Sequence, residues 1–302
     1  METGLEKRPL GRTGLSVTLL GFGALEIGRD WGLGGPAERQ RPAEAEAARV
    51  LNAVLDYGIN IIDTAAAYHR SEERIGKSVS HRRREYVLTS KCGEHNAEPD
   101  TYYDFSYEAV KRSIDRSLEL LQTDVIDVMQ IHFGPDPEEV LRDGGCVRAM
   151  KEARAEGKIR HVGASPDMDV LEACIESGDF DVLQVEYNLL NRAAGPLITK
   201  ASERGIGIFI RTGLAMGLLS PRAGAVLDRD PEARRRAQPY LDLVGGELER
   251  LTDLAWGFLA AHPGVSSVLL GTKSLDHLRA NVERARRGVD PDLVKKALEM
   301  GS

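Results

Sequence analysis

The sequence contains no long apolar run and few cysteines. None of its apolar stretches approaches the ~18 residues that a membrane-spanning helix needs. The N-terminal stretch METGLEKRPLGRTG lacks the apolar core of a secretory signal peptide. Cys92, Cys146 and Cys174 are odd in number and widely spaced, which gives no disulfide framework. These absences predict a cytoplasmic protein without a membrane partner.

An excess of positive charge is also missing. The chain has 40 Lys and Arg against 47 Asp and Glu, a net charge of −7. The basic clusters at 82–84 and 234–236 are short, so we expect solvated faces and no nucleic-acid partner. The segment CGEH at 92–95 has no second pair of residues at metal-ligand spacing, and no metal is predicted. No GxGxxG follows a predicted strand, so a Rossmann dinucleotide site is not supported.

Short β-rich apolar runs alternate with stretches of 3.6-residue periodicity along all 302 residues. The runs predict strands at 19–23, 60–63, 86–90, 125–130, 161–164, 182–185, 206–210 and 267–270. The periodic stretches predict helices at 44–57, 72–79, 106–121, 137–156, 168–177, 196–204, 248–261 and 275–286. Eight strands, each followed by a helix, predict an α/β protein with one (β/α)8 TIM barrel that fills a single domain, 1–302.

Additional segments are expected at the two ends of the barrel. Residues 8–17 read as a β-hairpin that precedes the first strand and caps the barrel bottom. Longer irregular segments, at 28–42, 92–105, 133–136 and 212–240, each follow a strand and should gather at the C-terminal rim. Their aromatic residues are candidate walls of a substrate pocket, or they pack the loops themselves: Trp31, Tyr102, Tyr103, Phe105 and Phe133.

Polar residues lie at or just beyond the ends of three successive strands. The second strand ends at Asp63, with Tyr68 in the following loop, and the next two end near Lys91 and His132. A phenol has a pKa of about 10 and donates protons poorly at neutral pH, but a nearby ammonium lowers that pKa. Asp63 can supply the counter-charge that a partly buried lysine needs. His132 can hydrogen-bond a carbonyl oxygen or tune the phenol, so the four residues are predicted to form one catalytic site.

With these motifs in order, the sequence resembles the aldo-keto reductase family over nearly the whole chain. The segment RPLGRTGLSVTLLGFGA is similar to the opening hairpin and first strand of the family. GINIIDTAAAYHRSEERIGK resembles the segment that carries the active-site Asp and Tyr. VLTSK and SLELLQTDVIDVMQIH match the strands of the catalytic Lys and His, and EGKIRHVGAS, QVEYN and GTKSLDHLRAN follow in the expected sequence.

The resemblance implies a metal-free reductase that takes hydride from NADP(H), with NAD(H) left open, and acts on a small carbonyl or alcohol substrate. Tyr68 would protonate the carbonyl oxygen, Lys91 and Asp63 would tune Tyr68, and His132 would orient the substrate. The implied cofactor contacts are Gly23, Ala24, Leu25, Asp63, Ser165, Gln184, Arg211, Thr212, Gly213, Leu214, Met216, Gly271, Thr272, Lys273, Ser274, His277 and Asn281. The stretch 271–274 precedes a helix, whose N–H groups can hold phosphate.

Three positions depart from the family pattern. Pro166 stands where an asparagine is usual, which removes an amide contact, and Arg211 stands where an aromatic residue often stacks on the nicotinamide. A guanidinium plane can stack as well. His277 replaces an arginine that reads the 2′-phosphate in some members, and Lys273 could supply that charge.

Two other functions stay open at this point. One is a regulatory protein that binds NADPH and turns over slowly, and the other is a different barrel enzyme, such as a cofactor-free isomerase or lyase. The intact set of four residues favours an enzyme over a regulatory protein. The substrate, the direction of the reaction and the oligomeric state leave no signature in the sequence.

Overall fold

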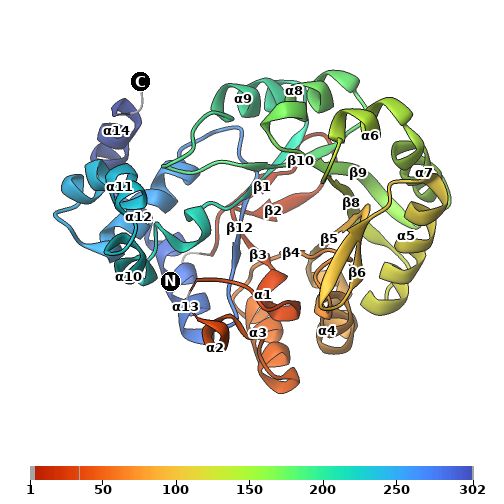
Figure 1. Cartoon of the computed structure of the whole chain (residues 1–302), viewed down its shortest axis with the longest axis horizontal. Helices are drawn as coiled ribbons and strands as arrows, with labels where there is room; N and C mark the ends of the chain where they lie inside the picture. Colours follow the sequence, from red (N-terminus) through yellow and green to blue (C-terminus); the bar gives the residue numbers. More distant parts are fainter. Residues whose placement is uncertain (1–3, 34, 301–302) are drawn as a thin grey trace.

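The predicted (β/α)8 barrel is confirmed in the computed structural model, which describes residues 4–33 and 35–300 (Figure 1). Eight parallel strands close into a ring in the order β10-β11-β12-β3-β4-β5-β8-β9. Their bounds are β3 (Leu20–Gly23), β4 (Ile61–Asp63), β5 (Val87–Cys92), β8 (Ile126–His132), β9 (Ile159–Ser165), β10 (Val182–Glu186), β11 (Gly207–Arg211) and β12 (Ser267–Gly271). Each coincides with a predicted strand, and the pairing of β12 with β3 closes the barrel.

A helix follows each barrel strand and packs outside it. These helices are α3 (Glu44–Asp56), α4 (Ser71–Val79), α5 (Tyr107–Leu121), α7 (Gly145–Ala155), α8 (Met168–Ser177), α9 (Gly195–Glu203), α12 (Leu248–Ala260) and α13 (Leu275–Arg287). Helix α5 shows why they form: Ser106 caps its first turn by accepting a hydrogen bond from Ala109 N, and Val110 and Ile114 bury one stripe.

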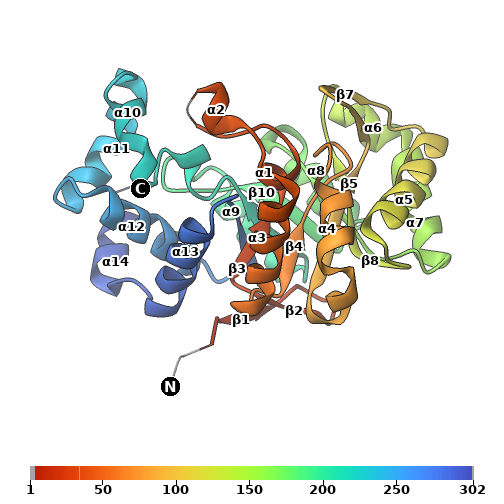
Figure 2. The same ribbon diagram turned by 90° about the horizontal axis from the view of Figure 1, so that it is seen from below.

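The N-terminal hairpin consists of β1 (Lys7–Pro9) and β2 (Ser16–Thr18), as predicted. Figure 2 places it at one end of the barrel, opposite α2 (Pro36–Arg39) and β7 (Asp100–Tyr103). Leu10 and Val17 are fully buried and pack against apolar residues inside the strands, among them Val128 and Phe209. The hairpin therefore closes the bottom and leaves the C-terminal rim as the open end.

Several predictions about the connections were wrong. The predicted helix 137–156 is two helices, α6 (Pro137–Asp143) and α7, because Gly144 adopts a φ of 66° that breaks the helix. The segment 92–105 is not irregular, since it folds into the antiparallel hairpin of β6 (Glu94–Ala97) and β7.

Other short elements were not predicted. They are α1 (Leu25–Gly28), α2, η1 (Ser80–Glu85), η2 (Ala215–Gly217), η3 (Pro221–Ala223), α10 (Gly224–Leu227), α11 (Pro231–Leu243) and α14 (Pro291–Glu299). Four of them (η2, η3, α10 and most of α11) lie within the segment 212–240, which was also expected to be irregular. No helix within 4–33 or 35–300 is long and apolar enough to span a bilayer.

Candidate active site

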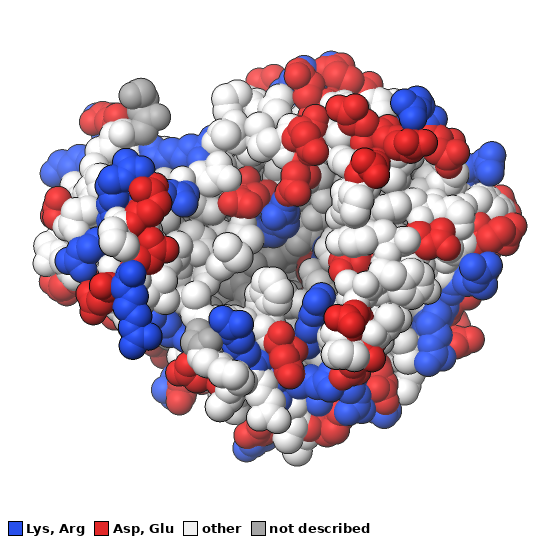
Figure 3. All heavy atoms as spheres, in the orientation of Figure 1, with Lys and Arg blue, Asp and Glu red and all other residues white. Residues whose placement is uncertain are grey.

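A cavity of about 540 Å³ opens at the C-terminal ends of the barrel strands. In Figure 3 this face is hollowed near its centre, with charged side chains of both signs around the hollow. All eight barrel strands contribute a residue at or near their C-terminal ends to the cavity: Gly23, Asp63, Lys91, His132, Ser165, Gln184, Arg211 and Gly271. Tyr68 lies in the loop after β4 and also lines the cavity. The four residues predicted as catalytic therefore share one cavity.

Asp63 and Lys91 form a buried ion pair at the base of this cavity. Lys91 Nζ lies 2.6 Å from Asp63 Oδ2 and donates a second hydrogen bond of 2.9 Å to the carbonyl of Thr64. The side chain of Lys91 is only 1% exposed and that of Asp63 only 3%. Burial alone would lower the pKa of Lys91, but Asp63 and Tyr68 more than offset it, so the pKa is raised and the ammonium keeps its proton.

Amide side chains fix the orientation of Asp63. Gln130 Nε2 donates to Asp63 Oδ1 at 3.1 Å, and Gln184 Nε2 lies 3.3 Å from Oδ2. Gln130 also donates to Thr89 Oγ1 at 2.6 Å, which holds the amide in place. With Thr89 Oγ1 also donating to Oδ1 at 3.5 Å, the carboxylate has four partners, and its position does not depend on Lys91 alone.

Tyr68 is held against the ammonium of Lys91. Its backbone is fixed by a hydrogen bond from Tyr68 N to the carbonyl of Ala65, and its own carbonyl accepts from Ser71 N at 2.9 Å. Lys91 Nζ lies 5.0 Å from the centre of the Tyr68 ring. Burial raises the pKa of Tyr68, and Lys91 opposes this only in part, so the net direction is upward. The position of Tyr68 in the sequence indicates only the lowering effect of Lys91 and not the burial that outweighs it.

His132 is paired with a residue that the sequence analysis did not select. The rings of Tyr68 and His132 meet edge to face with centres 5.9 Å apart. His132 Nδ1 lies 2.8 Å from Glu94 Oε2, and Thr101 Oγ1 donates to Glu94 Oε1 at 2.6 Å. Burial would raise the pKa of Glu94, but His132 and Thr101 hold it at about 2. Burial lowers the pKa of His132, which Glu94 partly opposes.

Glu94 belongs to the segment CGEH that the sequence analysis examined only as half of a metal site. Within 4–33 and 35–300 no group of three His, Cys, Asp or Glu side chains could hold a metal ion. The sequence signal for Glu94 was its place four residues after the predicted strand 86–90, whose end lies at the rim. Nothing in the sequence indicated that β6 would turn it toward His132.

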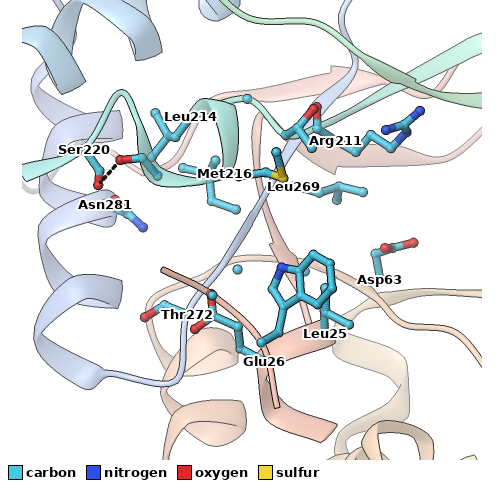
Figure 4. Close-up of a pocket in the computed structure, with 18 of the residues that line it drawn as sticks. Leu25, Glu26, Asp63, Arg211, Leu214, Met216, Ser220, Leu269, Thr272 and Asn281 are labelled. Carbon is cyan, nitrogen blue, oxygen red and sulfur yellow. Dashed lines mark hydrogen bonds between the residues drawn. The ribbon is translucent and has the colours of Figure 1, made fainter. Parts of the chain in front are cut away.

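A second region of the cavity extends from this centre toward the start of α13. Figure 4 shows Thr272 and Asn281 at one end and Asp63 and Arg211 at the other. Most of the predicted cofactor residues line this cavity: Gly23, Leu25, Asp63, Ser165, Gln184, Arg211, Thr212, Gly213, Leu214, Met216, Gly271, Thr272, His277 and Asn281. Ala24, Lys273 and Ser274 do not.

Those three residues support the lining from outside. The buried Ala24 accepts a hydrogen bond from Ser71 Oγ through its carbonyl, and Ser274 caps α13 by accepting from His277 N. Lys273 Nζ donates to the carbonyls of Glu38 and Gln40 and so ties the rim segment at α2 to the loop after β12.

The cavity fits a nicotinamide dinucleotide in three respects. The buried Gln184 Oε1 has no hydrogen-bond partner among the described residues, so it can accept from a carboxamide. The seam between β3 and β12 is lined by Gly23 and Gly271, and a Cβ added to Gly271 would lie 3.1 Å from Gly23 O. This bare backbone leaves room for a ligand. The 13-residue helix α13 presents its N-terminus beside Thr272, where backbone N–H groups can hold phosphate.

Arg211 does not extend freely over the cavity. Its guanidinium pairs with Asp167, contacts the carbonyl of Pro166 and lies 3.6 Å from Glu186 Oε2. If Arg211 stacks on the nicotinamide as predicted, it does so with the carboxylates of Asp167 and Glu186 beside its guanidinium. Neither acid was selected from the sequence, although Asp167 lines the cavity.

The aromatic residues predicted as pocket walls divide into two groups. Trp31 and Phe133 line the cavity, whereas Tyr102, Tyr103 and Phe105 do not. Tyr102 stacks on His95, and the other two stack on each other with ring centres 5.9 Å apart. The structure thus places those three rings in the packing of the β6–β7 hairpin and its flank. Lining residues that sequence reasoning missed include Glu26, Leu33, Arg222, Glu249, Thr252 and Arg284.

The barrel thus holds a buried Asp63–Lys91 pair next to Tyr68 at one end of a cavity whose lining runs to the start of α13. The sequence model of the Aldo/keto reductase family matches residues 19–297. The chain belongs to this family and is an NAD(P)H-dependent oxidoreductase.

Individual relatives agree with this assignment. The chain is 30% identical to L-galactose dehydrogenase of Arabidopsis thaliana over 93% of its own length and 88% of that protein. It is also 30% identical to pyridoxal 4-dehydrogenase of Microbacterium luteolum, with 92% of each chain covered. An aldo-keto reductase of Bacillus halodurans, solved in its holo form, superposes with a TM-score of 0.78 at 26% identity and covers 98% of this chain and 96% of its own.

Proposed function

We propose that this chain is an NADPH-dependent carbonyl reductase in which Tyr68 exchanges a proton with the carbonyl oxygen. The observation that carries the proposal is the buried pair of Lys91 and Asp63 beneath Tyr68 in the cavity. The relatives include a methylglyoxal reductase and several dehydrogenases, so the same site can serve reduction and the reverse oxidation.

The nicotinamide, when bound, supplies the hydride. The residues that would hold it are Gln184 and Ser165 toward the carboxamide, the 212–216 segment along its length, and Thr272 with the N-terminus of α13 at the phosphates. Because Gln184 Nε2 is already directed to Asp63, its free oxygen is the atom left to bind a ligand amide.

The proton step relies on Tyr68 remaining protonated until a carbonyl oxygen needs it. Burial keeps the phenol neutral, and the adjacent ammonium of Lys91 stabilises the phenolate that forms after the transfer. Asp63 keeps Lys91 charged in a place where an isolated ammonium would lose its proton. In the direction of oxidation the same arrangement lets the phenolate of Tyr68 accept the alcohol proton.

A preference for NADPH is supported by basic side chains near the start of α13. Arg222 and His277 line the cavity there, and together with Lys273 they act on the carboxyl of Glu26, whose pKa is raised by burial. Two basic side chains in the lining beside one partly buried acid suit an added phosphate better than a bare ribose. Replacing Arg222 with Met should weaken NADPH binding while NADH binding changes little, as measured by quenching of Trp31 fluorescence. Equal loss for both cofactors would contradict this preference.

The test of the catalytic assignment is Tyr68→Phe. It should cut carbonyl reduction by about 10²–10⁴-fold, the effect of losing a general acid, and leave NADPH affinity nearly intact. Tyr102→Phe is the matched control, because Tyr102 is an exposed rim tyrosine outside the cavity. An unchanged reduction rate in Tyr68→Phe would overturn the proposal.

A further inference from the structure

A second cavity at the rim adjoins the catalytic cavity, and charged side chains make up most of its lining. Its volume is about 470 Å³, and it lies between the rim segment after α1 and the turn of the β6–β7 hairpin. Trp31 and Gly32 line both cavities. The rest of its lining is Arg29, Asp30, Arg39, Arg41, His69, Glu98 and Pro99. We call this cavity the rim pocket.

The two cavities share a short stretch of wall. Trp31 is 44% exposed, and Gly32 adds no side chain to this wall. A Cβ built on Gly32 would meet nothing closer than Glu26 Oε1 at 4.0 Å. In the loop after β4, Tyr68 lines the catalytic cavity and the next residue, His69, lines the rim pocket. A ligand that passes over Trp31 and Gly32 can therefore have one end at Tyr68 and the other end in the rim pocket.

Positive charge exceeds negative charge in the rim pocket, where three arginines stand against two acids. Both acids are paired with Arg41, whose Nε lies 3.9 Å from Asp30 Oδ1 and whose Nη2 contacts Glu98. Arg29 and Arg39 have no ion pair and no side-chain hydrogen bond within residues 4–33 and 35–300. The pocket therefore offers two guanidinium groups whose N–H donors are not used by the protein.

Arg29 is the guanidinium nearer to the catalytic residues. Its side chain is half-buried, and its Cζ lies 6.0 Å from the centre of the Trp31 ring, over the residue that the two cavities share. Burial lowers the pKa of His69, and the charge of Arg29 lowers it further, so this ring is neutral at neutral pH. Burial would raise the pKa of Glu94, but His132, with Arg29 among the further causes, holds it at about 2. The charge of Arg29 thus acts both on the rim pocket and on the carboxylate that contacts His132.

A guanidinium without a carboxylate partner binds a carboxylate or phosphate group through paired N–H donors. We propose that the rim pocket is a subsite for the anionic group of the substrate, and that the enzyme selects carbonyl compounds whose far end carries a carboxylate or phosphate. Arg29 is the specificity-determining residue of this subsite, and Arg39 is its second cation. This inference rests on the proposed function, since the carbonyl group of the same molecule would lie at Tyr68.

The test compares aldehydes of matched shape that differ in charge, with NADPH as the reductant. The first pair is 4-carboxybenzaldehyde and its amide, 4-formylbenzamide. A longer pair, 3-(4-formylphenyl)propanoate and its amide, carries the charge further from the carbonyl. The wild-type enzyme should favour the acid over its amide in kcat/KM by about 10-fold in at least one pair, the effect of a hydrogen bond that involves a charge. Added NaCl should reduce this preference, because the pocket is open to solvent.

Arg29→Met removes the charge and keeps most of the length of the side chain. It should remove most of the advantage of the acid, while kcat/KM for the amide changes little. Arg39→Met should lower the advantage in part. Arg148→Met is the matched control, because Arg148 also covers an aromatic ring, that of Tyr107 at 5.0 Å, but lines neither cavity. This control should keep the full preference.

A binding measurement that needs no turnover gives a second readout. The ligands are 4-methylbenzoate and 4-methylbenzamide, which have no aldehyde group, and saturating NADP⁺ occupies the end of the catalytic cavity at α13. The acid should change the fluorescence of Trp31 more strongly than the amide does, and Arg29→Met should abolish this difference. Trp256 is buried on α12 and lines neither cavity, so Trp31→Phe shows how much of the signal comes from Trp31.

The outcomes distinguish the two proposals. If the wild-type enzyme reduces none of the four aldehydes, the proposed function is overturned, and the inference that rests on it falls as well. Reduction of the amides with the same kcat/KM as the acids would overturn the subsite alone, as would an equal loss for acid and amide in Arg29→Met. A response of Trp31 to 4-methylbenzoate that persists in Arg29→Met would also overturn the subsite, because the anion would then bind elsewhere.

Discussion

Breaking the pair of Asp63 and Lys91 should destabilise the barrel unequally, depending on which partner is removed. Loss of one partner of a buried ion pair typically costs about 3–5 kcal/mol, because the other charge is left without compensation. Lys91→Met leaves Asp63 with the amide donors of Gln130 and Gln184. Asp63→Asn leaves the ammonium with neutral oxygens only, such as the carbonyl of Thr64, and no counter-charge. We therefore expect Asp63→Asn to fall at the upper end of this range and Lys91→Met at the lower end.

The double variant provides the stricter test. With both charges removed, neither is left buried and unpaired, so Asp63→Asn/Lys91→Met should lose less free energy of unfolding than the sum of the two single losses. For groups 2.6 Å apart the coupling should be about 2–3 kcal/mol. Urea unfolding of the four proteins at neutral pH, followed by circular dichroism, measures all the terms of this cycle. If the loss in the double variant equals the sum of the two single losses, the two charges do not stabilise each other and the prediction is refuted.

Three more predictions concern the surroundings of the pair. Because burial raises the pKa of Tyr68, the rate of carbonyl reduction should stay level until the pH passes the ordinary tyrosine pKa of about 10. A fall in the rate below that pH, larger than the effect of a change of buffer, would contradict this. The pKa of Glu94 is depressed to about 2, so its charge stabilises the fold fully above its ordinary pKa of about 4.3, and this effect is lost as the pH falls toward 2. The melting temperatures of the wild type and of Glu94→Gln should therefore converge as the pH falls through this range. Gly28→Ala places a Cβ 2.2 Å from the carbonyl oxygen of Tyr68 and should lower the free energy of unfolding by at least about 1–3 kcal/mol and remove much of the activity. Gly35→Ala, on the same rim segment, meets nothing within 4 Å and should have the melting temperature and activity of the wild type.

The barrel could be predicted because its signals are local. Each buried strand is a short apolar run, and a parallel strand that is covered on both sides reads as such a run wherever it occurs. The strand-end position of Lys91 and His132 then followed from the rule that barrel enzymes place their chemistry at the C-terminal rim. The prediction of one helix at 137–156 was wrong for a local reason as well. Gly144 and Gly145 interrupt this segment, but only the left-handed conformation of Gly144 in the structure shows that the helix breaks there.

The rim could not be predicted in the same way, because its contacts join distant parts of the chain. Glu94 and His132 are brought together by the folding of the β6–β7 hairpin across the end of β8. Arg284 pairs with Glu249 from another helix at the far end of the cavity. Such pairs have no periodicity, so composition and spacing give no indication of them. The rings of Tyr102 and Phe105 show the reverse error, since aromatic residues in a rim segment can pack on their neighbours and never reach the cavity.

The register of the strands explains why one end of the cavity is polar and the seam beside it is bare. Gly271 pairs with Gly23, and Gly23 pairs in turn with Asp63, so the closing seam of the barrel and the ion pair occupy the same layer. Asp63 supplies the charge in that layer, and the two glycines supply no side chain at all. A ligand that reaches from Tyr68 to the start of α13 must pass over this seam, where any Cβ on Gly271 would crowd the backbone of Gly23. The same register that sets Asp63 in this layer therefore also leaves the seam that leads toward α13 without side chains at Gly23 and Gly271.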